Sequence, residues 1–452
     1  MKNKKKNRVA ALVALSVIAV LLVGACAAWW FAVRVRDAGA PDEKVMPVRI
    51  LWFEQYSADA VAHIAEAFTE ETGIPVIIEQ VSVPKFQAIA QQELASGYPR
   101  FDLLVGDSQW LGYGVENGYY EDLTAFVSEH KILGTFSEAA AKGYGEYPDG
   151  SGTYYTVPFG ANTIVYAYRS DWFENPAEQA AFKERYGRDL AVPRTYAELR
   201  DIAQFFYRPA DGRYGIVFPA SPTYDVVSML FGSILFGYGG SWGDRATCVA
   251  DGHINNDGAV AALELYRDLY QYAPPEAGGY AYAPAWDRFF KGDVAMEMNF
   301  ITHIGNNPYA SSTRFFSGLF GPASRDAQLA GQGVSLVTGA RNRDGALKFL
   351  DWWVTYETQL AFAEEGGLTT FRRVTASQRF KEHTPYNEAY AQSIEHVRDF
   401  WNVPRYSELL AISQLHLHDY LMSVSTSTEA AEQTLATILA QWQPILATAC
   451  KK

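Results

Sequence analysis

The sequence predicts an α/β protein with two strand-and-helix units and a helical C-terminal segment. Strand and helix patterns alternate over residues 48–105, and a second alternation of the same kind begins near residue 154. A strand, a helix and a strand at this spacing are typical of a parallel sheet with crossover helices. The chain has 452 residues, enough for two domains, and its 48% hydrophobic and 20% charged residues are typical of a folded globular protein.

The first unit contains three predicted strands and two predicted helices. The strands are residues 48–53, 76–81 and 101–105, and the helices are residues 59–72 and 84–96. The first helix places Ala60, Ile64 and Phe68 on one face, and Gly73 ends it, as glycine commonly does.

The second unit continues with strands, helices and a helical tail. Thr195, with Glu198 three residues later, forms a capping box for one of its helices. The last helix begins near Thr428, and we expect Pro444 to disturb it. The predicted strands are residues 155–158, 163–168, 214–218, 294–300 and 331–337, and the helices are residues 196–206, 256–272, 343–356 and 357–365.

The N-terminal 33 residues predict export and a membrane tether. Basic residues between Lys2 and Arg8 precede an uncharged, mostly apolar run over residues 9–33. Two hypotheses stay open: acylation of Cys26 after a lipoprotein-type cleavage site, or an uncleaved span that uses the whole run. Residues 34–46 are charged and contain a proline, so we interpret them as a linker.

Charge and cysteine content limit the partners and the crosslinks. The net charge of −13 argues against nucleic acid as a partner. If Cys26 carries lipid, Cys248 and Cys450 could form a disulfide, but nothing in the sequence brings them together. We therefore expect two unpaired thiols.

Short motifs lie along nearly the whole chain after the linker. They are residues 68–76 (FTEETGIPV), 101–104 (FDLL), 155–159 (YTVPF), 193–199 (PRTYAEL), 239–242 (GGSW), 286–296 (WDRFFKGDVAM) and 346–352 (ALKFLDW), the last leading to Gly366 and Gly367. In this order they resemble the extracellular solute-binding proteins of carbohydrate ABC importers, the group that includes maltose- and polyol-binding proteins. Phe101 stands where proline is commoner, and residues 368–370 replace a usual proline, so the resemblance leaves the ligand open.

The resemblance implies a two-lobed periplasmic-binding-protein-like fold of type II, with crossing segments between the lobes and a helical C-terminal tail. We expect residues 47–157 plus 300–340 to form lobe 1, and residues 158–299 plus 341–449 to form lobe 2. Such lobes close on a ligand by hinge motion.

Ligands of open α/β sheets bind beyond the carboxyl ends of the strands, so the loops there supply the candidate site. Aromatic faces suit the C–H surface of a sugar, and carboxylates and amides suit its hydroxyls. The candidates are Glu54, Tyr56, Asp107, Gln109, Trp110, Phe159, Asn162, Tyr238, Trp242, Trp286, Asn299 and Arg372.

Several candidates have a structural alternative. Trp110 and Trp286 could pack under helices, Asp107 could cap the next helix, and Arg372 could be a surface charge. Trp242 is favoured as a ligand contact because glycines surround it, and Asn299 because a buried amide needs partners. Trp52, inside a strand, is expected in the core.

The predicted function is capture of a carbohydrate-like solute (a sugar, oligosaccharide or polyol) outside the cytoplasm and delivery to an ABC permease. We expect a monomer that uses no cofactor or metal. Arg372, Arg373 and Lys85 keep an anionic sugar open. A ligand-binding sensor subunit is an alternative function.

An enzyme is the other alternative. Residues 239–243 fit the G-x-S-x-G nucleophile pattern, but the residues that follow predict a loop or hairpin and not the required helix. A carbohydrate-active hydrolase with two carboxylates stays open, because its acid and nucleophile need to be close only in space.

Overall fold

The structure is a computed structural model that describes residues 45–450 except 245, 305–310 and 424–426. The chain divides into two compact units, Met1–Met46 and Pro47–Lys452, and the second is described below. The expected anchor, Cys26 and nearly all of the expected linker lie outside the described residues.

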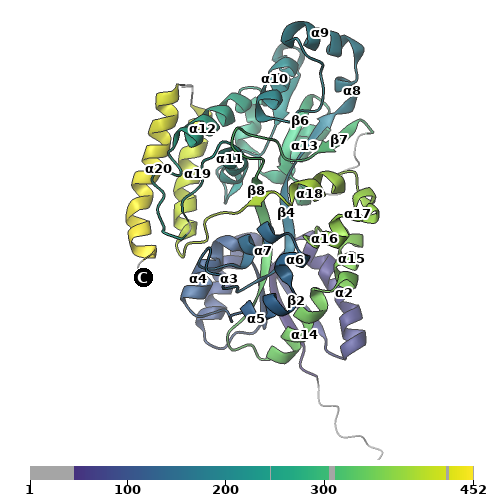
Figure 1. Cartoon of the computed structure of the whole chain (residues 1–452), viewed down its shortest axis with the longest axis vertical. Coiled ribbons are helices and arrows are strands. Elements are labelled where there is room, and N and C mark those ends of the chain that lie inside the picture. The colour runs from purple at the N-terminus through teal and green to yellow at the C-terminus, as the bar shows by residue number, and fades with distance from the viewer. Residues whose placement is uncertain (1–44, 245, 305–310, 424–426, 451–452) are drawn as a thin grey trace, which may run out of the picture. The chain divides into compact units, whose positions relative to one another are not determined.

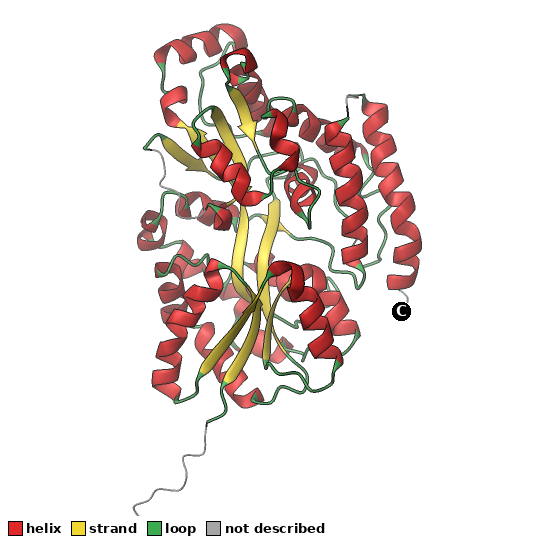
Figure 2. Cartoon of the chain, turned by 180° about the vertical axis from the view of Figure 1, so that it is seen from behind, coloured by secondary structure: helices red, strands yellow, loops and turns green. Residues whose placement is uncertain are grey.

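Among the described residues, nine strands form one sheet in the order β2-β1-β3-β8-β4-β6-β5, with β7 added to β4 and β9 added to β8 (Figures 1 and 2). The strands are β1 (Val48–Phe53), β2 (Val76–Val81), β3 (Leu103–Asp107), β4 (Val157–Arg169), β5 (Tyr214–Val217), β6 (Val294–Phe300), β7 (Thr313–Phe316), β8 (Ala327–Leu336) and β9 (Val397–Arg398). Strand β1 is parallel to β2 and β3, as the alternating sequence pattern predicts.

Helices cover this sheet. They are α2 (Tyr56–Thr72), α3 (Val83–Ala95), α4 (Leu111–Glu116), α5 (Thr124–Glu129), α6 (Ile132–Thr135), α7 (Glu138–Gly145), α8 (Ser170–Phe173), α9 (Pro176–Tyr186), α10 (Tyr196–Phe206), α11 (Val226–Gly237), α12 (Asp257–Tyr270), α13 (Tyr282–Phe290), α14 (Arg343–Trp353), α15 (Tyr356–Glu364), α16 (Arg372–Thr375), α17 (Gln378–His383), α18 (Asn387–Ser393), α19 (Tyr406–Met422) and α20 (Thr428–Ala449). The predicted capping box is present at α10, where Thr195 and Glu198 exchange hydrogen bonds.

Two long antiparallel strands, β4 and β8, connect the lobes. The first half of β4 pairs with β8, from Val157 opposite Val334 to Thr163 opposite Leu329. Its second half, from Ile164, pairs with β6 and β7 of the second lobe. The prediction of two separate strands here was wrong, because the residues between them remain hydrogen-bonded to β8 through a bulge.

A third crossing runs beside β8. Strand β9 pairs in parallel with the first residues of β8, and the chain then enters α19 and α20. These two helices pack against α11 and α12 of the second lobe (Figure 1). The helical tail is therefore part of that lobe's core.

The segment after β8 differs from the expected division into lobes. Helix α14 packs against β1, and α15 packs against α2, so both belong with the first lobe. The contact between Phe349 and Phe68, with ring centroids 5.5 Å apart, shows the same placement. Assigning residues 341–449 as a whole to lobe 2 was therefore wrong, since α14 packs on β1 and α15 on α2 of the first lobe.

Cys248 and Cys450 form a disulfide, contrary to the expected unpaired thiols. Their Cα atoms are 6.2 Å apart across a sequence separation of 202 residues. Helix α20 runs without interruption through Pro444 to Ala449, which delivers Cys450 to the loop that holds Cys248. The sequence did not show this because the approach depends on how α20 packs.

Helix α11 is buried along its whole length. Its residues are almost all apolar, so they lack the alternation of polar and apolar faces that identifies a surface helix. Trp52, predicted for the core, is fully buried. Within the part of the chain that the structure describes, no helix is both long and apolar enough to span a bilayer.

Candidate ligand-binding site

A cavity of about 600 Å³ lies between the two lobes. Its wall on the first lobe comes from the loops after β1 and β3, and its floor from β4, β8 and the segment after β9. Its wall on the second lobe comes from the residues before α11, the start of α13 and the residues after β6. Pockets that bind small molecules commonly measure roughly 300–1,000 Å³.

The first-lobe wall carries polar side chains and one large aromatic ring. Glu54 and Gln55 follow β1, and Asp107, Gln109 and Trp110 end or follow β3. Parallel neighbours end at the same edge of a sheet, and these residues meet there for that reason.

Trp110 rests on Phe86, with the two ring centroids 5.3 Å apart. Phe86 is fully buried, so the core holds the indole in place. The indole nitrogen of Trp110 is buried and has no hydrogen-bond partner among the described residues. Trp110 therefore offers the cavity an aromatic surface that the core holds in place.

Glycine and amide residues of the crossing strands form the floor. Gly331 has φ +100, and a Cβ atom there would collide with the carbonyl oxygen of Gly160 on β4. Both the backbone angle and the close approach of the strands require glycine at this position. Asn162 donates from Nδ2 to the hydroxyl of Thr302 at 2.5 Å, and both residues line the cavity.

The second-lobe wall contributes Tyr224, Asp225, Tyr282 and His303. The hydroxyl of Tyr282 donates to Oδ1 of Asp225 at 2.8 Å. The ring of Tyr282 also stacks on His303, with centroids 4.7 Å apart.

Tyr224 reaches across the cavity to the first lobe. Its hydroxyl donates to Oδ2 of Asp107 at 2.5 Å and accepts from Nε2 of Gln109 at 2.6 Å. Gln332 of β8 donates to the other oxygen of Asp107 at 3.0 Å and accepts from Gln55 at 2.8 Å. One hydrogen-bond network thus joins both lobes and a crossing strand, so the lobes are closed on each other in this structure.

The enclosure changes the acid–base behaviour of the lining groups. Burial, and then the charge of Asp107, raises the pKa of Asp225 to about 7. Burial likewise raises the pKa of Asp107, against three hydrogen bonds that act in the opposite direction. The surrounding protein lowers the pKa of His303 to about 4, and an imidazole with the ordinary pKa would also be mainly neutral at pH 7.

Comparison with known proteins identifies the family. The model of the bacterial extracellular solute-binding proteins matches residues 63–387. The chain belongs to this family. Membership places this solute-binding protein outside the cytoplasm, where the export signal also predicts it to be.

Curated relatives and solved structures are similar in sequence and fold. A maltotriose-binding protein of Pyrococcus abyssi is 23% identical over 56% of this chain and 51% of its own length. A mannitol-binding protein of Pseudomonas aeruginosa is 22% identical over 54% of this chain and 56% of its own length. The chain thus spans about half the length of these curated relatives. The structure of maltose-bound T. maritima MalE3 superposes with a TM-score of 0.70, at 21% identity, over 88% of this chain and all of that one. This likeness confirms the predicted two-lobed fold.

Five of the predicted ligand-binding residues line the cavity of this solute-binding protein: Glu54, Asp107, Gln109, Trp110 and Asn162. All five were chosen because they follow a strand or lie at a crossing segment. The structure brings them together, and their role in binding stays a prediction.

Three predicted aromatic contacts are packed in the core instead. Phe159 lies 4.2 Å from Trp353, measured between ring centroids, and Trp286 donates from its indole nitrogen to the carbonyl of Phe300 at 3.0 Å. Trp242 packs against Phe231, with centroids 5.8 Å apart. All three of these predicted contacts are 2% exposed or less, which leaves no surface for a ligand in the cavity.

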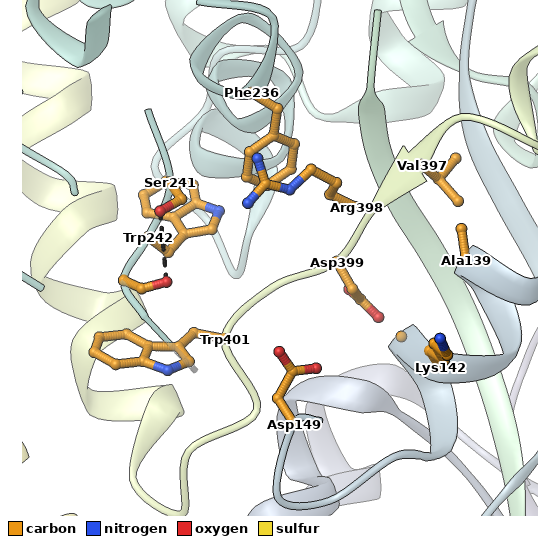
Figure 3. Close-up of a pocket in the computed structure, with 12 residues that line it drawn as sticks. Ala139, Lys142, Asp149, Phe236, Ser241, Trp242, Val397, Arg398, Asp399 and Trp401 are labelled. Atoms are coloured by element: carbon orange, nitrogen blue, oxygen red, sulfur yellow. Dashed lines mark hydrogen bonds between the residues drawn. The ribbon is translucent and has the colours of Figure 1, made fainter. Parts of the chain in front are cut away.

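The glycines around Trp242 have a packing role. A Cβ atom at Gly243 would collide with the ring of Trp401, so glycine is needed to admit that indole. Trp242 and Trp401 border a separate cavity of about 170 Å³, opposite Asp149 and Asp399 (Figure 3). Asp399 lines both cavities.

The four remaining candidates also lie outside the lining of the larger cavity. Tyr56 donates its hydroxyl to the carbonyl of Glu365 at 2.6 Å, and Arg372 pairs with Glu395 at 3.1 Å. Tyr238 packs near Tyr196 at the end of α11.

Asn299, the fourth, acts on the cavity indirectly. It is fully buried and donates to the carbonyl of Tyr282 at 2.8 Å. The buried amide of Asn299 therefore has the hydrogen-bond partners that it was expected to need. Its bond to the carbonyl of Tyr282 helps to hold this lining residue in place.

Sequence reasoning missed several lining residues: Gln55, Tyr224, Asp225, Tyr282, His303 and Gln332. Gln55 stands between two proposed residues and follows the same strand, so the existing rule could have included it. Tyr224 and Asp225 precede the uniformly apolar α11, which the periodicity of the sequence does not reveal.

The G-x-S-x-G segment lies in the loop between α11 and α12, not between a strand and a helix. The hydroxyl of Ser241 is 3.3 Å from Nδ1 of His253 and 3.5 Å from the carbonyl of Gly243. This loop lacks the turn that exposes a nucleophile at the end of a strand. Among the described residues, no group of three or more His, Cys, Asp or Glu is arranged to hold a metal ion.

Proposed function

We propose that this chain is a membrane-tethered solute-binding protein that captures a carbohydrate-like solute in the inter-lobe cavity and delivers it to an ABC permease. The carrying observation is the cavity itself, which combines an aromatic ring with carboxylates and amides from both lobes. Sugars and polyols need both, because they present C–H surfaces and many hydroxyls. The maltotriose- and mannitol-binding relatives support an oligosaccharide or a polyol.

Hinge motion about the crossing strands would open and close the cavity. Closure brings Tyr224 to Asp107 and removes the bound solute from water. A ligand that makes contacts with both lobes stabilises the closed form, because those contacts exist only when the lobes are together.

A carbohydrate screen tests this function. The full-length chain in detergent is mixed with monosaccharides, oligosaccharides and polyols, and its thermal unfolding and tryptophan fluorescence are recorded. We expect at least one of these to raise the unfolding temperature and change the fluorescence. Trp110→Phe should remove the fluorescence change, whereas Trp172→Phe, outside the cavity lining, should keep it.

The opposite result favours a hydrolase. If no carbohydrate shifts the unfolding temperature but the protein releases sugar from a glycoside, the binding function is wrong. Uptake assays test the permease step: loss of this chain should abolish uptake of the sugar that it binds.

We also propose that the N-terminal segment holds the protein at the membrane, near its permease. Tethering raises the effective concentration of the loaded protein at its partner. The mass of the mature N-terminus, measured on protein purified from membranes, should correspond to acylated Cys26 or to the intact chain. An unlipidated mature chain in the soluble fraction would contradict the tether.

A further inference from the structure

The charge of the cavity is strongly one-sided. Four carboxylates line it: Glu54, Asp107, Asp225 and Asp399. Among the described residues, no lysine or arginine does so. His303 is mainly neutral at pH 7, both with its lowered pKa of about 4 and with the ordinary value. The ionisable groups that line the cavity are therefore mainly carboxyl groups, and a bound cation would favour their ionised form.

Asp107 and Asp225 are the two central carboxylates, and they interact electrostatically with each other. Among the described residues, no lysine or arginine lines the cavity beside them. The donors to Asp107 are a tyrosine hydroxyl and two side-chain amides, and Tyr282 donates to Asp225. All of these donors are neutral. Asp225 is 6% exposed, and carboxylates removed from water are costly unless a positive charge accompanies them.

The side-chain carbonyl of Gln109, beside Asp107, is a further hydrogen-bond acceptor without a donor among the described residues. Gln109 is 2% exposed, and its Nε2 donates to Asp107 and Tyr224. Its carbonyl oxygen Oε1 is buried and has no hydrogen-bond partner among the described residues. This carbonyl thus lacks a donor, and no lysine or arginine of the described residues lines the cavity beside it.

The basic residues that left an anionic sugar open do not line the cavity. Arg372 pairs with Glu395, and the guanidinium of Arg373 lies 4.0 Å from the ring centroid of Tyr356. Lys85 is exposed and is not among the lining residues.

We propose that the cavity selects its sugar by charge, binding an amino-bearing carbohydrate more tightly than its neutral counterpart and rejecting acidic sugars. The ammonium group lies against Asp107 and Asp225, from one lobe each. An ammonium is compact and has three donors, so it can serve two carboxylates at once. This proposal rests on the carbohydrate-binding function proposed above.

Matched sugars test the charge preference directly. Isothermal titration at neutral pH compares glucosamine with glucose and glucuronate, and galactosamine with galactose and galacturonate, using the full-length chain in detergent. Maltose and the chitosan disaccharide extend the comparison to longer ligands. Where the sugars of a matched set bind, we expect the amine to bind about tenfold more tightly than the neutral sugar. The acidic sugar should bind about tenfold more weakly than the neutral sugar.

Two isosteric variants locate the effect. Asp225→Asn and Asp107→Asn should each weaken binding of the amine more than binding of the neutral sugar, so that the preference for the amine falls to about threefold or less. Asp419→Asn removes an exposed carboxylate of α19 that is not part of the lining, and it should keep the full preference. Thermal unfolding of each variant shows that it is folded, and each carboxylate variant is informative without the other.

The outcomes separate the two proposals. If a neutral or acidic sugar binds as tightly as its amine, or if Asp225→Asn keeps the full preference, the charge selection is overturned and the carbohydrate function stands. If no carbohydrate of any charge binds, the proposed function itself fails.

Discussion

Replacing Asp225 by asparagine should stabilise the ligand-free protein at neutral pH and flatten its pH dependence. Asp225 lies before α11, 6% exposed, and accepts a hydrogen bond from Tyr282 at Oδ1. Asparagine keeps that acceptor and the shape of the side chain, but it cannot ionise. The substitution therefore tests the charge alone.

The pKa of Asp225 sets the magnitude. It rises from 3.8 to about 7 in the folded protein. Each pH unit between these values corresponds to about 1.4 kcal/mol, so an ionised Asp225 lowers the free energy of unfolding by about 4 kcal/mol at most. If the lobes open, water reaches the carboxylate of Asp225 and the penalty of its burial disappears. The free energy of opening is therefore an upper limit on the stability difference between wild type and Asp225→Asn.

The direction of the pH dependence follows from the number of protons bound by the folded and the unfolded chain. Between about pH 4 and about pH 7 the folded protein keeps a proton that the unfolded chain has lost, so the free energy of unfolding falls as the pH rises through this window. Above about pH 7 this contribution is constant. Asp107, whose pKa is also raised, contributes in the same direction and remains in the variant.

Urea unfolding of wild type and Asp225→Asn at about pH 4 and about pH 7.5 measures the effect. The two proteins should differ little at the acidic pH, and the variant should be more stable at the higher pH. Asp419→Asn, which changes an exposed carboxylate, is the control and should follow the wild type. Equal pH dependence of wild type and Asp225→Asn would refute the reasoning.

Three further changes test the closed form, the floor and the disulfide. Tyr224→Phe removes the hydroxyl that joins the lobes and should shift the ligand-free protein toward the open form about tenfold, seen as a larger radius of gyration in X-ray scattering; an unchanged radius would count against this link. Gly331→Ala should lower the unfolding temperature more than Gly118→Ala, because both have positive φ but only the former meets neighbouring backbone; equal losses would show that the close approach is unimportant. Cys248→Ser with Cys450→Ser should cost about 2–5 kcal/mol of stability, and reductant should destabilise the wild type but not the double variant.

The order of elements could be predicted from sequence wherever the pattern is local. The periodicity of residues 48–81 located β1, α2 and β2, and the capping box located the start of α10. Helix α11 was not predicted because it is apolar on all sides and therefore has no amphipathic pattern. The disulfide and the placement of α14 depend on contacts between distant segments, which no local pattern carries.

Sequence patterns could predict the residues that the first lobe contributes to the candidate site, but hardly those of the second lobe. Strand ends supply Glu54, Asp107 and Gln109, since parallel strands deliver their following loops to one edge. Tyr224 and Asp225 enter the cavity because α11 is packed in the second lobe and its preceding loop faces the first. Trp242 and Trp286 have the residue type that binds sugars, but packing decides whether an indole faces a ligand or the core.

Closure and binding depend on the same atoms in this protein. Tyr224 holds the closed lobes together by donating to Asp107. Gln332 of the neighbouring strand β8 also donates to Asp107, which is where the proposed ligand would donate. Closing without a ligand brings the carboxylates of Asp107 and Asp225 together in a poorly hydrated space, and this opposes closure at neutral pH. A ligand with several donors relieves that repulsion only in the closed form, so its binding energy shifts the equilibrium toward closure. The acidic lining therefore favours closure around a ligand with several donors over closure of the empty cavity.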